Sequence, residues 1–210
     1  MTPEVIDFAD EVVAAGYSVV MPHLFGTPGA PLGFLAMAKT LPRVCISREF
    51  TRLRLARTSP VAVWLRSLAR SLHAELGGHG IGVVGMCFTG GFALAMMVDP
   101  VVAAPVVAQP SLPFAIGRKR GRDLNLSPAD LDAVKARAAA GCRLLGLQYK
   151  NDRATGKRFD RLEAEIGAAF VRIEFPGKLH ATLTAHRQQA AVDAVLDFLL
   201  QELRPPDNQT

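Results

Sequence analysis

Residues 81–95 read IGVVGMCFTGGFALA, and this stretch decides the fold. A short apolar run breaks at Cys87, and apolar residues then resume at the spacing of a helix. This order predicts a strand, a sharp turn and a helix, with Cys87 at the tip of the turn. A residue at such a turn is held in a strained backbone conformation, so its neighbours must be small. Gly85, Gly90 and Gly91 provide the room that strand and helix need to pass close together.

The position of Cys87 suggests a reactive thiol. At the start of a helix, unpaired backbone N–H groups and the helix dipole favour the thiolate over the thiol, and the thiolate is the nucleophilic form. The alternative is a structural cysteine in a tight turn, because free cysteines are among the most buried residues. The choice between the two depends on partners elsewhere in the chain.

Apolar runs of strand length alternate with amphipathic stretches along the rest of the chain, whereas residues 22–60 carry only weak signals. This alternation predicts an α/β fold in which a mostly parallel sheet is covered by helices on both faces, as a single domain over residues 1–210. The predicted strands are 17–21, 81–86, 101–107, 142–149 and 170–175. Besides the helix after Cys87, the predicted helices are 2–15, 60–76, 127–140, 156–166 and 184–203.

Composition excludes several classes of function. The 24 basic and 19 acidic residues are interleaved, and no stretch resembles a nucleic-acid-binding motif. Cys45, Cys87 and Cys142 lie far apart without a CxxC pair, which argues against a disulfide framework or a zinc site. We found neither an export signal nor a run of about 18 to 20 apolar residues, so we expect a cytoplasmic protein without a membrane span.

Three polar residues that follow predicted strands form a candidate catalytic set. Cys87, Asp152 and His180 each lie just past a strand, where parallel sheets gather their active groups. An imidazole can hold the thiol proton while a carboxylate orients the ring, and the backbone N–H of Phe88 could hold an oxyanion. Taken singly, Asp152 could be a solvated turn residue and His180 a surface histidine, but their joint placement favours catalysis.

With these residues in hand, the sequence resembles the dienelactone hydrolase family of α/β-hydrolases. The resemblance covers nearly the whole chain. It rests on AAGYSVVMPHLFG at 14–26, GMCFTGG at 85–91, the turn at Asp152, and PGKLH at 176–180. It implies the α/β-hydrolase fold and cleavage of a small carboxylic ester or lactone through an acyl-cysteine. It also implies Cys87 as nucleophile, His180 as base and Asp152 as its orienter, without cofactor or metal, in a monomer or small homo-oligomer.

The sequence departs from the family pattern in three places. Many members have glycine where this chain has Thr89, which we expect to narrow or polarise the pocket, and many read Pro-Asp at Pro22-His23. Family members also have a strand directly before the helix that here begins at Thr2, and the loop after it supplies a second oxyanion donor. We therefore expect an N-terminally incomplete fold, in which Met1 is not the natural start or the protein is a truncated relative.

These departures leave a second function open, namely a catalytically weak α/β-hydrolase scaffold with a binding or regulatory role. The predicted loop 110–126 carries a cationic cluster, for which a solvated surface is favoured over contact with a substrate carboxylate. The cluster consists of Arg118, Lys119, Arg120 and Arg122.

Overall fold

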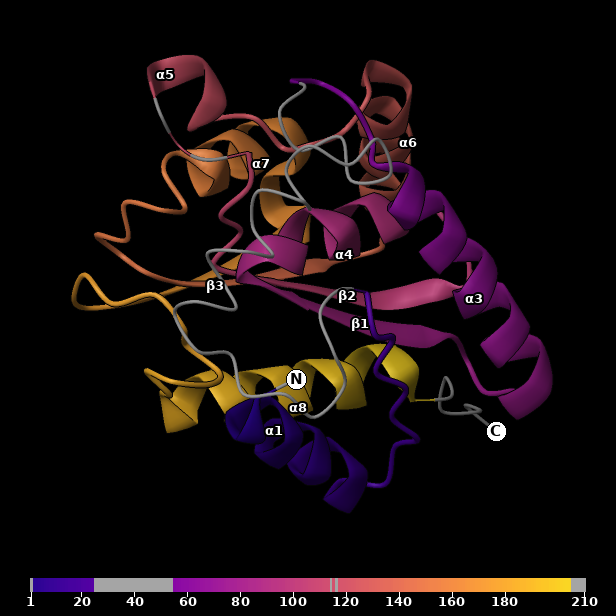
Figure 1. Ribbon diagram of the computed structural model, residues 1–210. Coiled ribbons are helices and arrows are strands. Elements are labelled where there is room, and N and C mark those ends of the chain that lie inside the picture. Colours follow the sequence, from indigo (N-terminus) through magenta and orange to yellow (C-terminus); the bar gives the residue numbers. More distant parts are fainter. Residues whose placement is uncertain (1, 25–54, 114, 116, 205–210) are drawn as a thin grey trace.

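A four-stranded parallel sheet forms the centre of the molecule (Figure 1). The computed structural model describes residues 2–24, 55–113, 115 and 117–204. The strands follow one another across the sheet in chain order, so their carboxyl ends lie along one edge. They are β1 (Ile81–Met86), β2 (Val102–Ala108), β3 (Leu144–Tyr149) and β4 (Phe170–Phe175).

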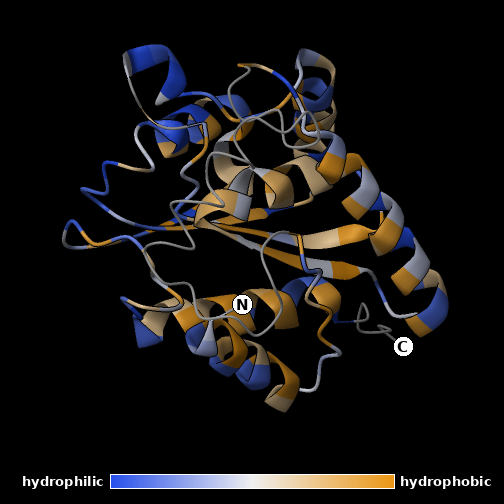
Figure 2. Cartoon of the chain, viewed as in Figure 1, coloured by the Kyte–Doolittle hydropathy of each residue, from blue (hydrophilic) through white to orange (hydrophobic). Residues whose placement is uncertain are grey.

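Helices cover both faces of this sheet, as predicted (Figure 1). Figure 2 shows that the strands are mostly hydrophobic, whereas hydrophobic and hydrophilic residues alternate along the helices. One face packs against α3 (Pro60–Leu76), α4 (Gly90–Met96), α6 (Pro128–Ala139) and α7 (Arg158–Ile166). The other packs against α1 (Pro3–Ala14) and α8 (Gln189–Leu203). A single turn of helix, α5 (Gly117–Arg120), lies in the loop after β2.

The sharp turn at Cys87–Thr89 between β1 and α4, called the elbow below, has the close packing that its glycines predict. A Cβ atom at Gly85 would lie 2.5 Å from the carbonyl oxygen of Thr89, and one at Gly90 would lie 2.8 Å from Pro110. Three residues of 3-10 helix, Cys87–Thr89, come between β1 and α4, so the α-helix begins later than predicted. All seven residues of α4 are buried, whereas Cys87, Phe88 and Thr89 before it are partly exposed.

The prediction of a strand at 17–21 is wrong. These residues belong to no strand, although Tyr17 and Val19 pack against the core between α1, α8 and the sheet. Val20 and Met21 are 49 % and 37 % exposed. A strand needs a hydrogen-bonded neighbour, which an apolar pattern does not report, and Tyr17 and Val19 pack against the core outside any strand.

The last helix begins at Gln189 rather than at residue 184. Residues 182–186 form a turn instead, and the backbone N–H groups of His186 and Gln188 are hydrogen-bonded to the carbonyl oxygens of Ala181 and Thr182. His186 thus lies in the loop that carries His180 and not in the helix.

Several expectations concern parts of the chain that are not described. Met1, Cys45 and most of the weakly patterned segment 22–60 lie outside the described residues. Within the described ranges, no helix has the length and apolar character required to cross a bilayer.

Candidate active site

Cys87 occupies a strained position at the carboxyl end of β1. Its φ angle is +52°, a left-handed value that is uncommon outside glycine and is stable only when the surroundings impose it. Ser111, which follows β2, donates its backbone N–H to the carbonyl oxygen of Cys87 at 3.0 Å. The hydroxyl of Thr89 is hydrogen-bonded to both the N–H and the carbonyl of Met86, at 3.0 Å each. These contacts hold the elbow from both sides.

Asp152 and His180 form a hydrogen-bonded pair. His180 Nδ1 lies 2.7 Å from Asp152 Oδ2, and the side chains are 28 % and 4 % exposed. Asp152 also accepts hydrogen bonds from the backbone N–H of Ala154 and the hydroxyl of Thr155, both at 2.8 Å. The carboxylate is therefore fixed on three sides, and it orients the ring so that Nε2 remains for another partner.

The electrostatics of Cys87 and His180 are coupled. Burial alone would raise the pKa of the Cys87 thiol, but hydrogen bonding and charge from His180 outweigh it, with help from Ser111 and the N–H of Phe88. The net result is a thiol pKa below its ordinary value. Burial alone would lower the pKa of His180, but Asp152 and then Cys87 raise it from 6.5 to about 10. Each of the two groups therefore favours the charged form of the other.

Asp152 is ionised in this arrangement. Burial alone would raise its pKa, but the hydrogen bonds from His180, Thr155 and Ala154 outweigh burial and hold the pKa below its ordinary value. Asp152, His180 and Cys87 thus follow one another across the edge of the sheet.

The structure brings together the residues that the sequence selected. Asp152 follows β3 as a buried, paired carboxylate rather than a solvated turn residue. His180 follows β4 and interacts with both Asp152 and Cys87 rather than lying free on the surface. The backbone N–H of Phe88 interacts with the Cys87 sulfur and contributes to the lowered pKa of the thiol.

Thr89 does not present a free hydroxyl to the site. Both of its hydrogen bonds are to Met86, so its polar atom is used to close the turn. The expectation that this hydroxyl polarises a pocket finds no support in its contacts.

Ser111 is a neighbour of Cys87 that sequence reasoning missed. Its Oγ lies 3.2 Å from Cys87 Sγ, and the residue is 7 % exposed. A serine is not titratable in the ordinary range, so Ser111 does not stand out among the titratable groups that follow strands. The signal was present, because Ser111 lies just past β2, the strand that pairs with β1.

Arg158, at the start of α7, is a second residue that sequence reasoning missed. It is 1 % exposed, and burial lowers its pKa to about 10, opposed by the charges of Asp123 and Asp152. Its guanidinium donates hydrogen bonds to backbone carbonyls from two loops beside the site. The acceptors are the carbonyl oxygens of Pro110, Pro113, Arg120, Asp123, Ala154 and Thr155. Since this residue sits inside an amphipathic helix, nothing in the sequence distinguished it from a surface arginine.

Two polar side chains, those of the buried Gln109 and the exposed His186, fix the loop that carries His180. Gln109 Oε1 accepts hydrogen bonds from the hydroxyl of Thr182 at 2.7 Å and from its N–H at 3.4 Å. His186 Nδ1 accepts from the N–H of Ala181 at 3.3 Å. The end of β2 is thereby tied to the loop after β4.

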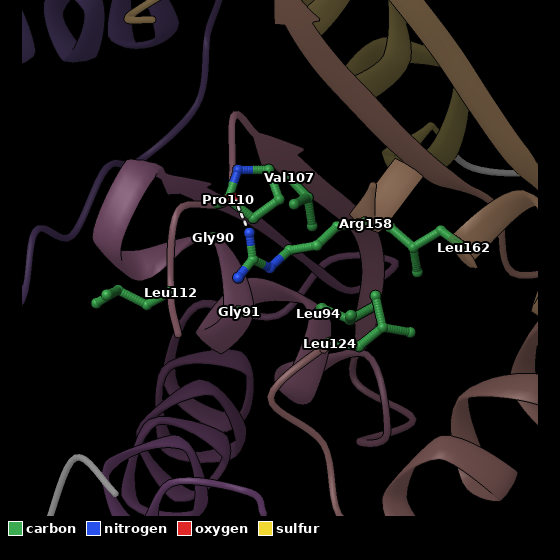
Figure 3. A pocket seen from close by; sticks show the side chains of 9 residues that line it. All are labelled: Gly90, Gly91, Leu94, Val107, Pro110, Leu112, Leu124, Arg158 and Leu162. Atoms are coloured by element: carbon green, nitrogen blue, oxygen red, sulfur yellow. Dashed lines mark hydrogen bonds between the residues drawn. The ribbon is translucent and has the colours of Figure 1, made fainter. Parts of the chain in front are cut away.

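A small pocket lies beneath the elbow (Figure 3). Its volume is about 10 Å³, which is close to the space of one water molecule. Gly90, Gly91 and Leu94 of the elbow contribute to its lining, opposite Arg158, which donates to the carbonyl of Pro110. Neither Cys87 nor His180 lines this pocket, and it is too small for an ester.

Among the described residues, no group of three or more His, Cys, Asp or Glu side chains is placed to hold a metal ion. No protein-family model matches the chain, and a search of curated proteins finds no significant match. The candidate site is therefore judged by its own geometry.

Proposed function

We propose that this chain is a hydrolase of the α/β-hydrolase fold, similar to the dienelactone hydrolase family, which cleaves a carboxylic ester or lactone through an acyl-cysteine. The observation that carries the proposal is the row formed by Asp152, His180 and Cys87, in which the carboxylate lies 2.7 Å from one ring nitrogen and the ring interacts with the thiol. A nucleophile, a base and an orienting acid are the groups that acyl transfer requires.

The first half of the proposed reaction forms the acyl-enzyme. The Cys87 thiolate attacks the carbonyl carbon, and the carbonyl oxygen takes the negative charge, facing the N–H of Phe88. When the tetrahedral intermediate collapses, the carbon–oxygen bond of the ester breaks. The departing alkoxide takes the proton of the His180 imidazolium, and a thioester remains on Cys87.

The second half releases the acid. Neutral His180 accepts a proton from water as the water attacks the thioester carbonyl. Collapse of this intermediate expels the Cys87 thiolate and gives a carboxylic acid, and the imidazolium is restored. Asp152 stabilises the imidazolium each time it forms, because its charge is buried beside Nδ1.

Hydrolysis of a chromogenic aryl ester tests the proposal. The wild type should release the chromophore, and Cys87→Ala should reduce turnover to the rate without enzyme. Cys142→Ala is the matched control, because Cys142 has a raised pKa from burial and lies near Arg137, away from the site. Equal turnover by the wild type and Cys87→Ala would remove Cys87 from the mechanism. A wild type with no activity toward aryl esters or lactones would favour the scaffold role instead.

A further inference from the structure

Ser111 contacts Cys87 twice, through different atoms. Its hydroxyl oxygen lies 3.2 Å from the Cys87 sulfur, and its backbone N–H donates to the Cys87 carbonyl oxygen at 3.0 Å. With the sulfur as a thiolate, only the hydroxyl can be the donor, because the thiolate has no proton to give. The sulfur then receives a hydrogen bond from Ser111, and His180 and the N–H of Phe88 also lower the pKa of the Cys87 thiol.

The segment that carries Ser111 is fixed in place. The buried Arg158 donates to the carbonyl oxygens of Pro110 and Pro113, on either side of Ser111. Pro110 also packs directly against Gly90 of the elbow, where even a methyl group would clash. The hydroxyl is therefore held ready beside the sulfur and needs no rearrangement when charge is present there.

We propose that Ser111 is the hydroxyl donor that stabilises the Cys87 thiolate in the resting protein. This inference deepens the proposed function and rests on it for the role of Cys87. The hydroxyl favours the charged sulfur over both the thiol and the thioester, neither of which carries the charge. It therefore increases the fraction of thiolate near neutral pH and, in exchange, makes each thiolate a weaker nucleophile.

The combination of a larger thiolate fraction and a weaker nucleophile distinguishes a thiolate donor from a merely structural residue. Each hydrogen bond to an ionised group shifts its pKa by about one unit, so Ser111→Ala should move the midpoint of Cys87 reactivity up by about one pH unit. The rate at the high-pH plateau should then rise about 2- to 3-fold, while the rate well below the midpoint should fall about 3- to 4-fold. Loss of packing alone would not raise the plateau.

The measurement is the pH dependence of alkylation by iodoacetamide, followed at Cys87 by mass spectrometry of its peptide. Ser111→Thr retains the hydroxyl and should keep the midpoint of the wild type, and Ser67→Ala, on the exposed side of α3, is the control for a serine away from the site. Thermal unfolding of each variant establishes that it is folded. Ser111→Ala retains the backbone hydrogen bond to Cys87, so the elbow keeps that support.

An unchanged midpoint in Ser111→Ala, a lower plateau, or an equal shift in Ser111→Thr would each overturn the inference. Alkylation requires no ester, so the two proposals fail separately. A shifted midpoint together with a wild type that hydrolyses no ester or lactone would retain the role of Ser111 and reject the hydrolase. Ester hydrolysis that depends on Cys87, with no shift of the alkylation midpoint in Ser111→Ala, would retain the hydrolase and reject the role of Ser111.

Discussion

Replacing Asp152 with asparagine removes a charge from the site and keeps the size of the side chain. Asp152 Oδ2 lies 2.7 Å from His180 Nδ1, and the aspartate side chain is only 4 % exposed, so water and salt screen the pair weakly. An opposite charge at this distance shifts a pKa by about 1 to 3 units. That shift corresponds to about 1.4 to 4 kcal/mol in favour of the imidazolium. We expect the pKa of His180 to fall from about 10 by this amount in Asp152→Asn.

Imidazole chemical shifts measured across a pH titration report this pKa directly. The protein has five histidines, and His180→Gln identifies the signal that belongs to His180. Asp197→Asn, on the exposed side of α8, is the matched control and should leave the titration unchanged. A wild-type midpoint near 6.5, or the same midpoint in the wild type and Asp152→Asn, would refute the proposed ion pairing.

The same pair makes stability depend on pH in a defined direction. The pKa of His180 is raised above 6.5, so its contribution to the free energy of unfolding is full below pH 6.5 and is lost as the pH rises through about 10. The pKa of Asp152 is lowered, so its contribution is present above pH 3.8 and is lost as the pH falls through its folded value. In urea unfolding, the free energy of unfolding of the wild type should therefore exceed that of Asp152→Asn by most near pH 6 and by least near pH 10.

Two further substitutions test the supports of the site by urea unfolding. Gly85→Ala should lower the free energy of unfolding by about 1 to 3 kcal/mol or more, because its Cβ would meet backbone that cannot move. Gly121→Ala, whose φ lies outside the left-handed region and whose added Cβ would come no closer than 3.3 Å to another atom, should cost less, and an equal loss would refute the packing argument. Arg158→Met should cost several kcal/mol, because each buried carbonyl left without a donor costs about 1 to 3 kcal/mol. Arg118→Met, on the exposed turn α5, is its control, and similar losses from both would contradict the role of the buried guanidinium.

The elements that the sequence predicted well are those whose boundaries carry clear local signals, such as a capping residue, a proline or a glycine. Ser127 caps α6 by accepting from the N–H of Asp130, and Pro128 begins the helix, as the sequence indicates. The glycines around Cys87 predicted the elbow because the steric requirement there is local. Cys87, Asp152 and His180 could be selected because the carboxyl ends of parallel strands share one edge, so chain order gives proximity.

The missed features depend on contacts that are distant in sequence. The stretch 17–21 has the composition of a strand, but no local signal states whether a neighbouring strand pairs with it. The burial of Arg158 is set by loops from other parts of the chain, and its role is invisible in a helix that otherwise reads as amphipathic. Ser111 was missed because its importance comes from the charge on its neighbour rather than from its own chemistry.

Because α4 is completely buried, the candidate site has two parts that should differ in the free energy needed for local unfolding. Amide hydrogens of a helix with no solvent face exchange only when most of the molecule unfolds, whereas loop amides exchange through small local openings. Cys87 adjoins the resistant part, while Asp152 and His180 lie on loops after β3 and β4. On warming, His180 and Asp152 should separate from Cys87 before the sheet unfolds. Under the proposed mechanism, activity should therefore be lost at a lower temperature than the fold.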